Sequence, residues 1–91
     1  MSAINADLLM ENLKVFICNN FPIARQREVT LDDRLLDDGF VDSLGLLVIV
    51  EHLEESYEIT VNDDDLRVEN FGSIRTIAHY VADQLKGNAG A

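Results

Sequence analysis

The stretch DDGFVDSLGLLVIV, residues 37–50, places a long apolar run directly behind two polar residues. Asp42 and Ser43 precede the run, and Gly45 alone interrupts it. The three β-branched residues at its end favour a strand, but apolar positions continue past residue 50 at helical spacing. The residues at this spacing are Leu46, Ile49, Val50, Leu53 and Tyr57. The pattern therefore predicts a helix over residues 43–56, with Asp42 as its N-cap.

The segment ahead of this helix begins with another helical pattern. Asn5 is a suitable N-cap, and Asp7 places a carboxylate in the first turn, where the helix end is positive. At about 100° per residue, one face collects Leu9, Leu13, Phe16 and Ile17, opposite Glu11 and Asn19. We expect a helix over residues 6–19.

Residues 21–41 form a long connection, which is unusual in a compact domain. Apolar residues are spread along it, and they are Val29, Leu31, Leu35, Leu36 and Phe40. We therefore expect this loop to pack over the helices. Gly39 indicates a turn immediately before the next helix.

The C-terminal third predicts one short helix and one long helix. Asn62 and the acidic run 63–65 start a short helical turn that ends near Arg67. Ser73 is the expected cap of a last helix that ends at Lys86. The inner face of that helix carries Ile74, Ile77, Ala78, Val81 and Leu85.

These elements together predict an all-α fold. The expected architecture is a four-helix bundle of three long helices and one short helix, with a long packed loop between the first two. A chain of 91 residues with 47% hydrophobic residues suits one small domain with a modest core. We expect this domain to span residues 1–86 and residues 87–91, GNAGA, to form a flexible tail.

The composition limits the range of partners. There are 17 acidic and 7 basic residues, which give a net charge of -10. Such a surface repels nucleic-acid phosphates and anionic lipids and favours partner proteins with basic patches. Cys18 is the only cysteine, and its apolar surroundings predict a buried structural thiol. The N-terminal residues resemble neither a signal peptide nor a membrane span, so we expect a cytoplasmic monomer that binds neither nucleic acid nor membrane.

Ser43 is the most conspicuous polar residue in the pattern. As the first residue after the N-cap, its hydroxyl lies beside backbone N–H groups that have no partner within the helix. Those donors and the positive helix end suit a phosphate ester. A polar residue that is merely tolerated at a helix start explains the same position, and position alone leaves both interpretations open.

Other kinds of site fit the sequence poorly. The G-x-S-x-G motif of a serine hydrolase requires glycine at the place of Val41, and His52 and His79 are both expected on outward faces. An EF-hand loop fails because Arg67 stands where the third ligand belongs. Two distant histidines and one buried cysteine do not form a zinc site. We therefore predict no catalytic residues and no metal ligands.

The segment GFVDSL, residues 39–44, opens an amphipathic helix in a small, acidic chain of four expected helices. In this context it resembles the acyl and peptidyl carrier protein family. The segment ENFGSIRTIAHYV, residues 69–81, resembles the fourth helix of that family, so the similarity covers roughly residues 6–86.

The resemblance implies that Ser43, between Asp42 and Leu44 of the attachment motif, carries 4'-phosphopantetheine. A phosphopantetheinyl transferase takes this group from coenzyme A. The protein is then a non-catalytic carrier that holds an acyl or aminoacyl group as a thioester. Its further partners are the ligase that loads this cargo and a downstream synthase or transferase, while the cargo itself stays open.

The helix predicted over residues 43–56 also has a distinctive outward side, opposite its core face. Leu44, Leu47 and Val48 form a small apolar patch there, and carboxylates border it at Glu51, Glu54 and Glu55. Because carrier proteins present this helix to their enzymes, we expect a partner-docking surface. The alternative is that the long loop folds over Leu44 and Leu47 and buries them.

The motif departs from the fatty-acid carriers at this surface. Gly45 and Val48 stand where those carriers usually have acidic residues, and the glycine suggests close approach by a partner or by the cofactor arm. GFVDSLG is more similar to D-alanyl carriers and other stand-alone carriers of specialised pathways. A different class of function also stays open, an acidic helical adaptor that binds a protein partner without a cofactor.

Overall fold

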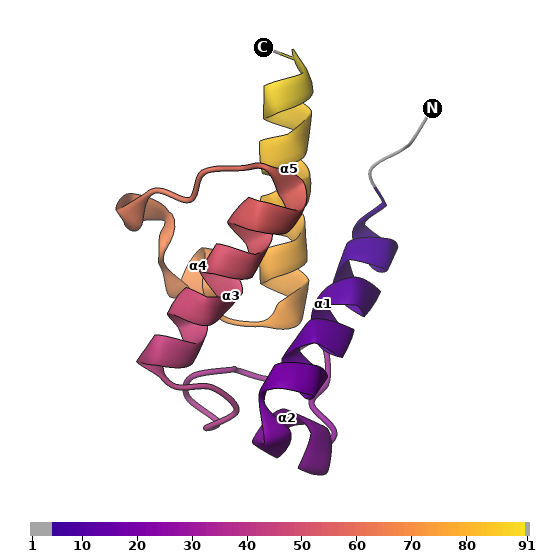
Figure 1. Ribbon diagram of the computed structural model, residues 1–91, viewed down its shortest axis with the longest axis vertical. Helices are drawn as coiled ribbons and strands as arrows, with labels where there is room; N and C mark the ends of the chain where they lie inside the picture. Colours follow the sequence, from indigo (N-terminus) through magenta and orange to yellow (C-terminus); the bar gives the residue numbers. More distant parts are fainter. Residues whose placement is uncertain (1–4, 91) are drawn as a thin grey trace.

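The chain folds into an all-α bundle (Figure 1). The computed structural model describes the backbone of residues 5–90 and the side chains of residues 5–87. No strand occurs in this part of the chain. The elements are α1 (Ala6–Asn20), α2 (Pro22–Gln26), α3 (Ser43–Tyr57), the 3-10 helix η1 (Asp63–Asp65), α4 (Val68–Phe71) and α5 (Ile74–Gly90). The predicted fold class of three long helices with short ones is confirmed.

The three long helices enclose one core. Figure 1 shows α1 and α5 running along the long axis of the molecule, with α3 crossing in front of α5. The start of α3 and the short helix α2 lie at the same end of the bundle, at the bottom of the view. Among the described residues, no helix has the length and apolar character needed to cross a membrane.

Helix α1 follows the sequence pattern closely. The Asn5 side chain accepts a hydrogen bond from the Asp7 N–H over 2.9 Å, which satisfies one of the unpaired donors at the helix start. The predicted inner face packs into the core with three buried residues and one half-buried residue, which are Leu9, Leu13, Ile17 and Phe16. Cys18 is half-buried and packs against the same core, so the thiol is less enclosed than expected.

The long connection contains a short helix, α2, that the sequence pattern does not predict. Pro22 occupies the first position of α2, where its fixed φ suits a helix start and its missing N–H costs nothing. Ala24 in this turn is completely buried. A helix of five residues is too short to produce a recognisable apolar period, which explains why the segment was predicted as loop.

The rest of the connection packs on the bundle as predicted, with one exception. Val29, Leu35 and Phe40 are buried. Leu36, also expected to pack inward, is 43% exposed. The neighbouring Leu35 explains this difference, because its N–H donates to the Gly72 carbonyl over 2.9 Å and its side chain points into the core. The predicted turn at Gly39 is present, with a φ of 81° that favours glycine.

The short helical turn predicted from Asn62 to near Arg67 is present as η1, and a further short helix, α4, was not predicted. The helical turn η1 ends at Asp65, and α4 follows from Val68. Phe71 at the end of α4 is buried in the core. The Tyr80 hydroxyl of α5 donates a hydrogen bond to Asp65 Oδ2 over 2.8 Å, which ties η1 to the last helix.

Helix α5 starts where expected and ends later. The Ser73 hydroxyl accepts a hydrogen bond from the Thr76 N–H over 3.2 Å and caps the helix. The predicted inner face is buried at Ile74, Ile77, Ala78 and Val81, and Leu85 is half-buried. The backbone stays helical to Gly90, past the predicted end at Lys86, because an established helix adds one hydrogen bond for each further residue. Ala91 of the predicted tail lies outside the described residues.

Candidate functional site

Ser43 is the first residue of α3, and its position depends on the residue before it. Asp42 has extended backbone angles, and its Oδ1 accepts a hydrogen bond from the Gly45 N–H over 2.7 Å. The Asp42 carbonyl accepts the first helical hydrogen bond, from the Leu46 N–H over 2.9 Å. The predicted N-cap is therefore present. It fixes the first turn of α3 and leaves the Ser43 side chain exposed.

The surroundings of Ser43 suit a phosphate ester but not nucleophilic catalysis. In the described part of the chain, the Ser43 hydroxyl makes no side-chain hydrogen bond to a base. Ser43 and His52 are nine residues apart on one helix, and at about 1.5 Å per residue the rise alone separates them by about 13 Å. His79 is exposed on α5. No described histidine is placed to activate Ser43.

The position of His52 differs from the prediction. Its ring stacks on the Phe16 ring of α1, with 3.7 Å between the ring centroids and an angle of 10° between the planes. Its Nδ1 lies 3.3 Å from the Ser56 hydroxyl. Burial lowers the pKa of His52, and the nearby Glu55 carboxylate opposes this shift. The helical projection was wrong here because α1 covers the flank of α3 that His52 occupies, which spacing within α3 cannot reveal.

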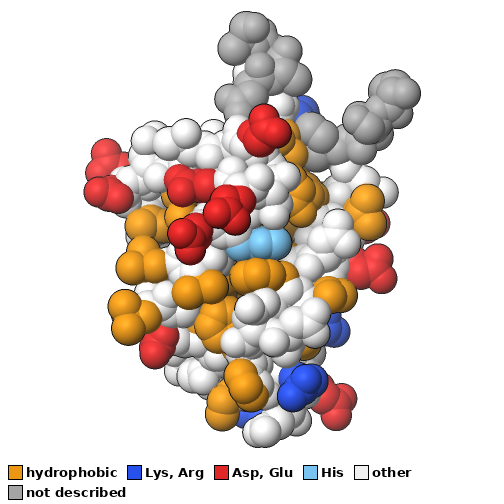
Figure 2. Space-filling model, viewed as in Figure 1, with side chains coloured by type: hydrophobic (Ala, Val, Ile, Leu, Met, Phe, Trp, Pro, Cys, Tyr) orange, Lys and Arg blue, Asp and Glu red, His pale blue; other side chains and the backbone are white. Residues whose placement is uncertain are grey.

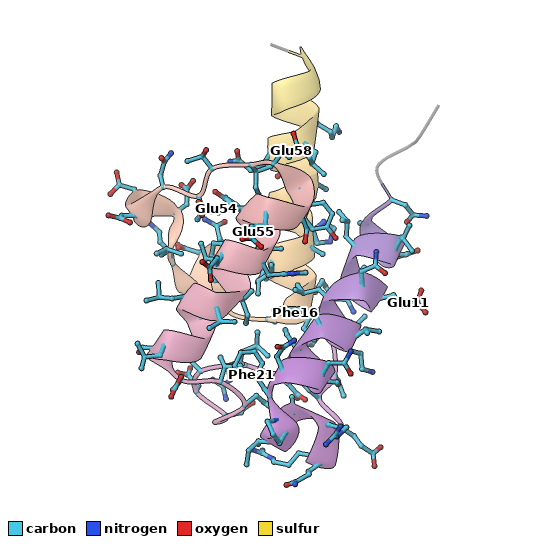
Figure 3. The ribbon with its side chains drawn as sticks, in the orientation of Figure 1. Glu11, Phe16, Phe21, Glu54, Glu55 and Glu58 are labelled. Carbon is cyan, nitrogen blue, oxygen red and sulfur yellow. The ribbon has the colours of Figure 1, made fainter. Side chains whose placement is uncertain are left out.

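The structure explains why position 45 is a glycine, which the sequence alone did not. The ring of Phe21, at the end of α1, lies so close to α3 that a Cβ on Gly45 would stand 2.7 Å from Phe21 Cε1. Figure 3 shows Phe21 between the lower end of α1 and the start of α3. The close approach expected from a partner or from the cofactor arm is made within the chain, by Phe21. A glycine inside an amphipathic helix was the only sequence signal of this contact.

The outward side of α3 is apolar near Ser43. Leu44 is 72% exposed, Leu47 53% and Val48 44%. The long loop does not bury Leu44 and Leu47, so that alternative is excluded. On the opposite face, Ile49 and Leu53 are buried, whereas the other predicted core residues are only half-buried, and these are Leu46, Val50 and Tyr57.

Carboxylates lie farther along the same helix. Glu51 and Glu55 are exposed, whereas Glu54 is half-buried and its Oε2 accepts a hydrogen bond from the Val61 N–H over 2.9 Å. This hydrogen bond fixes the segment that follows α3, so Glu54 has a structural role besides the predicted role in partner docking. Figure 2 shows acidic side chains over the upper half of this face and apolar side chains over the lower half.

A groove of about 800 Å³ opens beside Ser43. Phe21, Pro22 and Ile23 form one wall, and the first turn of α3 forms the other. The sequence pattern does not predict this groove, because its walls come from segments about 20 residues apart in the chain. Among the described residues, no group of three or more side chains is placed to hold a metal ion.

Comparison with known proteins agrees with this geometry. A family model described as "Phosphopantetheine attachment site" matches residues 17–81, well over half of the chain. The chain belongs to this family of carrier proteins. The matched segment begins in α1 and ends in α5, so it includes the N-terminal turn of α3 and both walls of the groove.

Similar carrier proteins occur in several bacteria. One, named acyl carrier protein, from Exiguobacterium sibiricum, is 37% identical over 60 residues, which cover 66% of this chain and 73% of the relative. The acyl carrier protein of Clostridium perfringens is 25% identical over 78 residues, covering 86% of this chain and 99% of the relative. That of Brachyspira hyodysenteriae is 27% identical over 78 residues, covering 86% and 97%.

Membership in this family settles the class of function. The chain is a non-catalytic carrier protein with a phosphopantetheine attachment site. The family implies a phosphopantetheinyl transferase and acyl-handling enzymes as partners. The residues at the start of α3 fit the group, because an exposed hydroxyl stands at a helix N-terminus beside an open apolar groove.

Proposed function

We propose that Ser43 is the attachment residue for phosphopantetheine. The family match contains three serines, and their environments differ. Ser73 is buried as the cap of α5, and Ser56 lies in the last turn of α3 next to His52. Ser43 alone combines exposure with a helix N-terminus, and this observation carries the proposal.

The first turn of α3 provides what a bound phosphate ester requires. The helix N-terminus is positive, and its first N–H groups have no partner within the helix. The Asp42 carboxylate accepts the Gly45 N–H, which keeps this turn in place and the Ser43 hydroxyl exposed to the transferase. When the cofactor is attached, its terminal thiol holds the acyl or aminoacyl cargo as a thioester.

We assign partner docking to the outward side of α3. Its apolar part is formed by Leu44, Leu47 and Val48, and its acidic border by Glu51 and Glu55, with Glu54 contributing less because it also bonds Val61. The apolar patch suits the buried centre of an interface, and the carboxylates suit a basic rim on the partner. The transferase, the loading ligase and the downstream synthase or transferase are the expected partners.

The proposed pathway is a specialised one with its own ligase or synthase. Gly45 no longer supports this part of the proposal, because Phe21 already accounts for the glycine. Val48 still supports it, since an exposed apolar side chain replaces an acidic residue on the docking surface. A cytoplasmic location and a monomeric state belong to the same proposal.

The sequence alone left open an acidic adaptor that carries no cofactor, and the family match favours the carrier. Intact mass spectrometry after incubation with coenzyme A and a broad-specificity transferase separates the two. Wild type and Ser56→Ala should each gain one phosphopantetheine, whereas Ser43→Ala should gain none. Folded wild type that gains nothing from several transferases supports the adaptor.

A further inference from the structure

The groove beside Ser43 is built from three separate segments. α2 contributes Ile23, the loop before α3 contributes Leu36, and α3 contributes Val48. These side chains are 45%, 43% and 44% exposed, although each lines the same recess. Apolar side chains that gather around one recess and stay half-exposed are typical of a binding site.

The floor of the groove is held in place. Gly45 lets the Phe21 ring lie directly against the backbone of α3, and the space for a Cβ is filled by that ring. On the side formed by the loop, the buried Phe40 closes the groove. The Arg27 Cζ atom lies over the Phe40 ring, 4.4 Å from its centroid. The groove is therefore formed before any ligand enters it.

The chemistry of the lining matches one available ligand. Asp42 is the single charged residue among the described residues that line the groove, and its Oδ1 is occupied by the Gly45 N–H. The other lining residues are apolar or uncharged. Pantetheine offers a dimethyl-substituted carbon and methylene groups separated by two amides. Its apolar parts can cover the exposed side chains while its amides stay at the open side, in water.

A second recess competes for the same ligand. It has a volume of about 150 Å³ and lies between α3 and α4, where Leu46, Leu66, Val68 and Phe71 line it. Ser43 lines the first recess and not the second. A short tether gives its ligand an effective concentration on the order of mM, so even weak apolar contacts in the adjoining groove suffice to hold it.

We propose that the groove between α2 and α3 holds the pantetheine arm along the protein surface and shields its terminal thiol from solvent. This inference rests on the proposed attachment at Ser43. The partner-docking residue Val48 forms part of the same wall. A partner that contacts Val48 therefore reaches the groove and can displace the arm towards its own active site.

The direct test is an NMR experiment on the wild-type protein with the arm attached and its two methyl groups labelled with 13C. The groove predicts nuclear Overhauser effects from these methyl groups to Phe21 and Ile23. Effects to Leu66 or Val68 would place the arm in the second recess and overturn the inference. Arm signals that coincide with those of free pantetheine would also overturn it.

The matched variants are Ile23→Ser in the groove, Val68→Ser in the second recess and Val15→Ser on the exposed side of α1. The readout is the rate at which a neutral reagent alkylates the arm's thiol, with mass spectrometry to separate it from Cys18. Only undocked arms react, so Ile23→Ser should accelerate alkylation by about threefold to tenfold. The other two variants should react like wild type. Equal rates in all variants, or acceleration by Val68→Ser, contradict the inference.

The two levels of the proposal fail in different ways. A wild-type protein that gains no phosphopantetheine overturns attachment at Ser43 and the groove with it. A protein that gains the arm on Ser43 but shows free-arm signals overturns the groove alone. All three replaced side chains are exposed, and an amide spectrum confirms that each variant is folded.

Discussion

Gly45 is the residue on which the geometry of the site depends. It is the third residue of α3, where alanine would favour the helix by about 1 kcal/mol. The Phe21 ring, however, occupies the space that a methyl group needs, and Asp42 Oδ1 lies 3.2 Å from the same point. Glycine therefore allows the Phe21 ring, which follows the end of α1, to pack against the first turn of α3 beside Ser43.

Gly45→Ala is predicted to destabilise the protein despite its better helix propensity. Overpacking typically costs about 1–3 kcal/mol, so we expect a net loss of up to about 2 kcal/mol in the free energy of unfolding. Urea denaturation of a double-mutant cycle checks this. In the Phe21→Ala background, Gly45→Ala should instead stabilise. A destabilisation of the same size in both backgrounds would show that Phe21 is not the cause.

We predict that His52 makes the stability depend on pH near neutrality, because its ring is half-buried against Phe16. Burial lowers its pKa below 6.5, so between pH 6.5 and the lowered pKa the unfolded chain binds more protons than the folded chain does. The contribution of neutral His52 is present above pH 6.5 and is lost as the pH falls through the lowered pKa. Thermal unfolding between about pH 7.5 and pH 5.5 should show this loss.

The matched variant for this prediction is His52→Gln, which removes the titrating ring. It should flatten the pH dependence of the melting temperature in that range while lowering its value, because the stack on Phe16 is lost. A wild-type melting temperature that rises on acidification, or an equally steep dependence in His52→Gln, would contradict this role.

Helix α3 divides its apolar residues between two tasks. Ile49 and Leu53 are buried in the core, whereas Leu44, Leu47 and Val48 stay exposed. We predict that Val48→Glu changes the free energy of unfolding by less than about 0.5 kcal/mol, as an exposed substitution should. It should nevertheless weaken binding to the dedicated partner, which then has to desolvate a carboxylate. Calorimetry and loading kinetics measure the two effects.

The control for this prediction is Ile49→Glu. Ile49 is completely buried, so a carboxylate there should unfold the bundle or destabilise it severely. Val50, which the sequence placed on the core face, is a weaker control because it is only half-buried. If Val48→Glu leaves both stability and loading rates unchanged, Val48 is ordinary surface and the specialised docking surface loses its main support.

The elements differ in how well the sequence predicted them. The apolar stripes of α1 and α5 gave the correct inner faces, because long amphipathic helices carry a strong period. The N-cap Asp42 and the exposed Ser43 were also predictable, since both depend on neighbours within a few residues. The helix α2, the outward Leu36, the stacked His52 and the contact between Phe21 and Gly45 were not. The helix α2, like the unpredicted α4, is too short to show an apolar period, whereas the other three features depend on partners far away in the chain.

At the scale of the whole molecule, the distribution of charge favours the proposed approach of partners to the site. The net charge of -10 is distributed over many surfaces, but Figure 3 shows Glu54, Glu55 and Glu58 together along the upper half of α3. The groove and Ser43 occupy the other end of the same helix. We therefore expect a partner with a basic patch to be attracted to the helix that carries the proposed attachment residue.

We predict that Glu51→Lys combined with Glu55→Lys slows phosphopantetheine transfer by roughly tenfold at low salt. Each substitution replaces a negative charge with a positive one and raises the net charge by two, so the net charge changes from -10 to -6. The difference from wild type should shrink as salt rises, because exposed charges are screened over about 8–10 Å near physiological ionic strength. Glu54 is left unchanged because its carboxylate accepts a hydrogen bond from the Val61 N–H, which supports the fold.

The matched control carries the same change in net charge elsewhere. Glu11 on α1 and Asp83 on α5 are exposed, and Glu11 points away from α3 in Figure 3. Glu11→Lys combined with Asp83→Lys should leave the transfer rate close to that of wild type. If both pairs slow transfer equally, net charge alone is responsible and the acidic part of α3 has no special role.

The central claim is that Ser43 is the one attachment residue, and peptide mapping by tandem mass spectrometry tests it most directly. The wild-type protein is modified with coenzyme A and a transferase, digested, and searched for the phosphopantetheine on each serine. We predict one group per chain, on Ser43, with Ser56 and Ser73 unmodified. A group found on Ser56 or Ser73, or a folded protein that takes up no group at all, would contradict the claim.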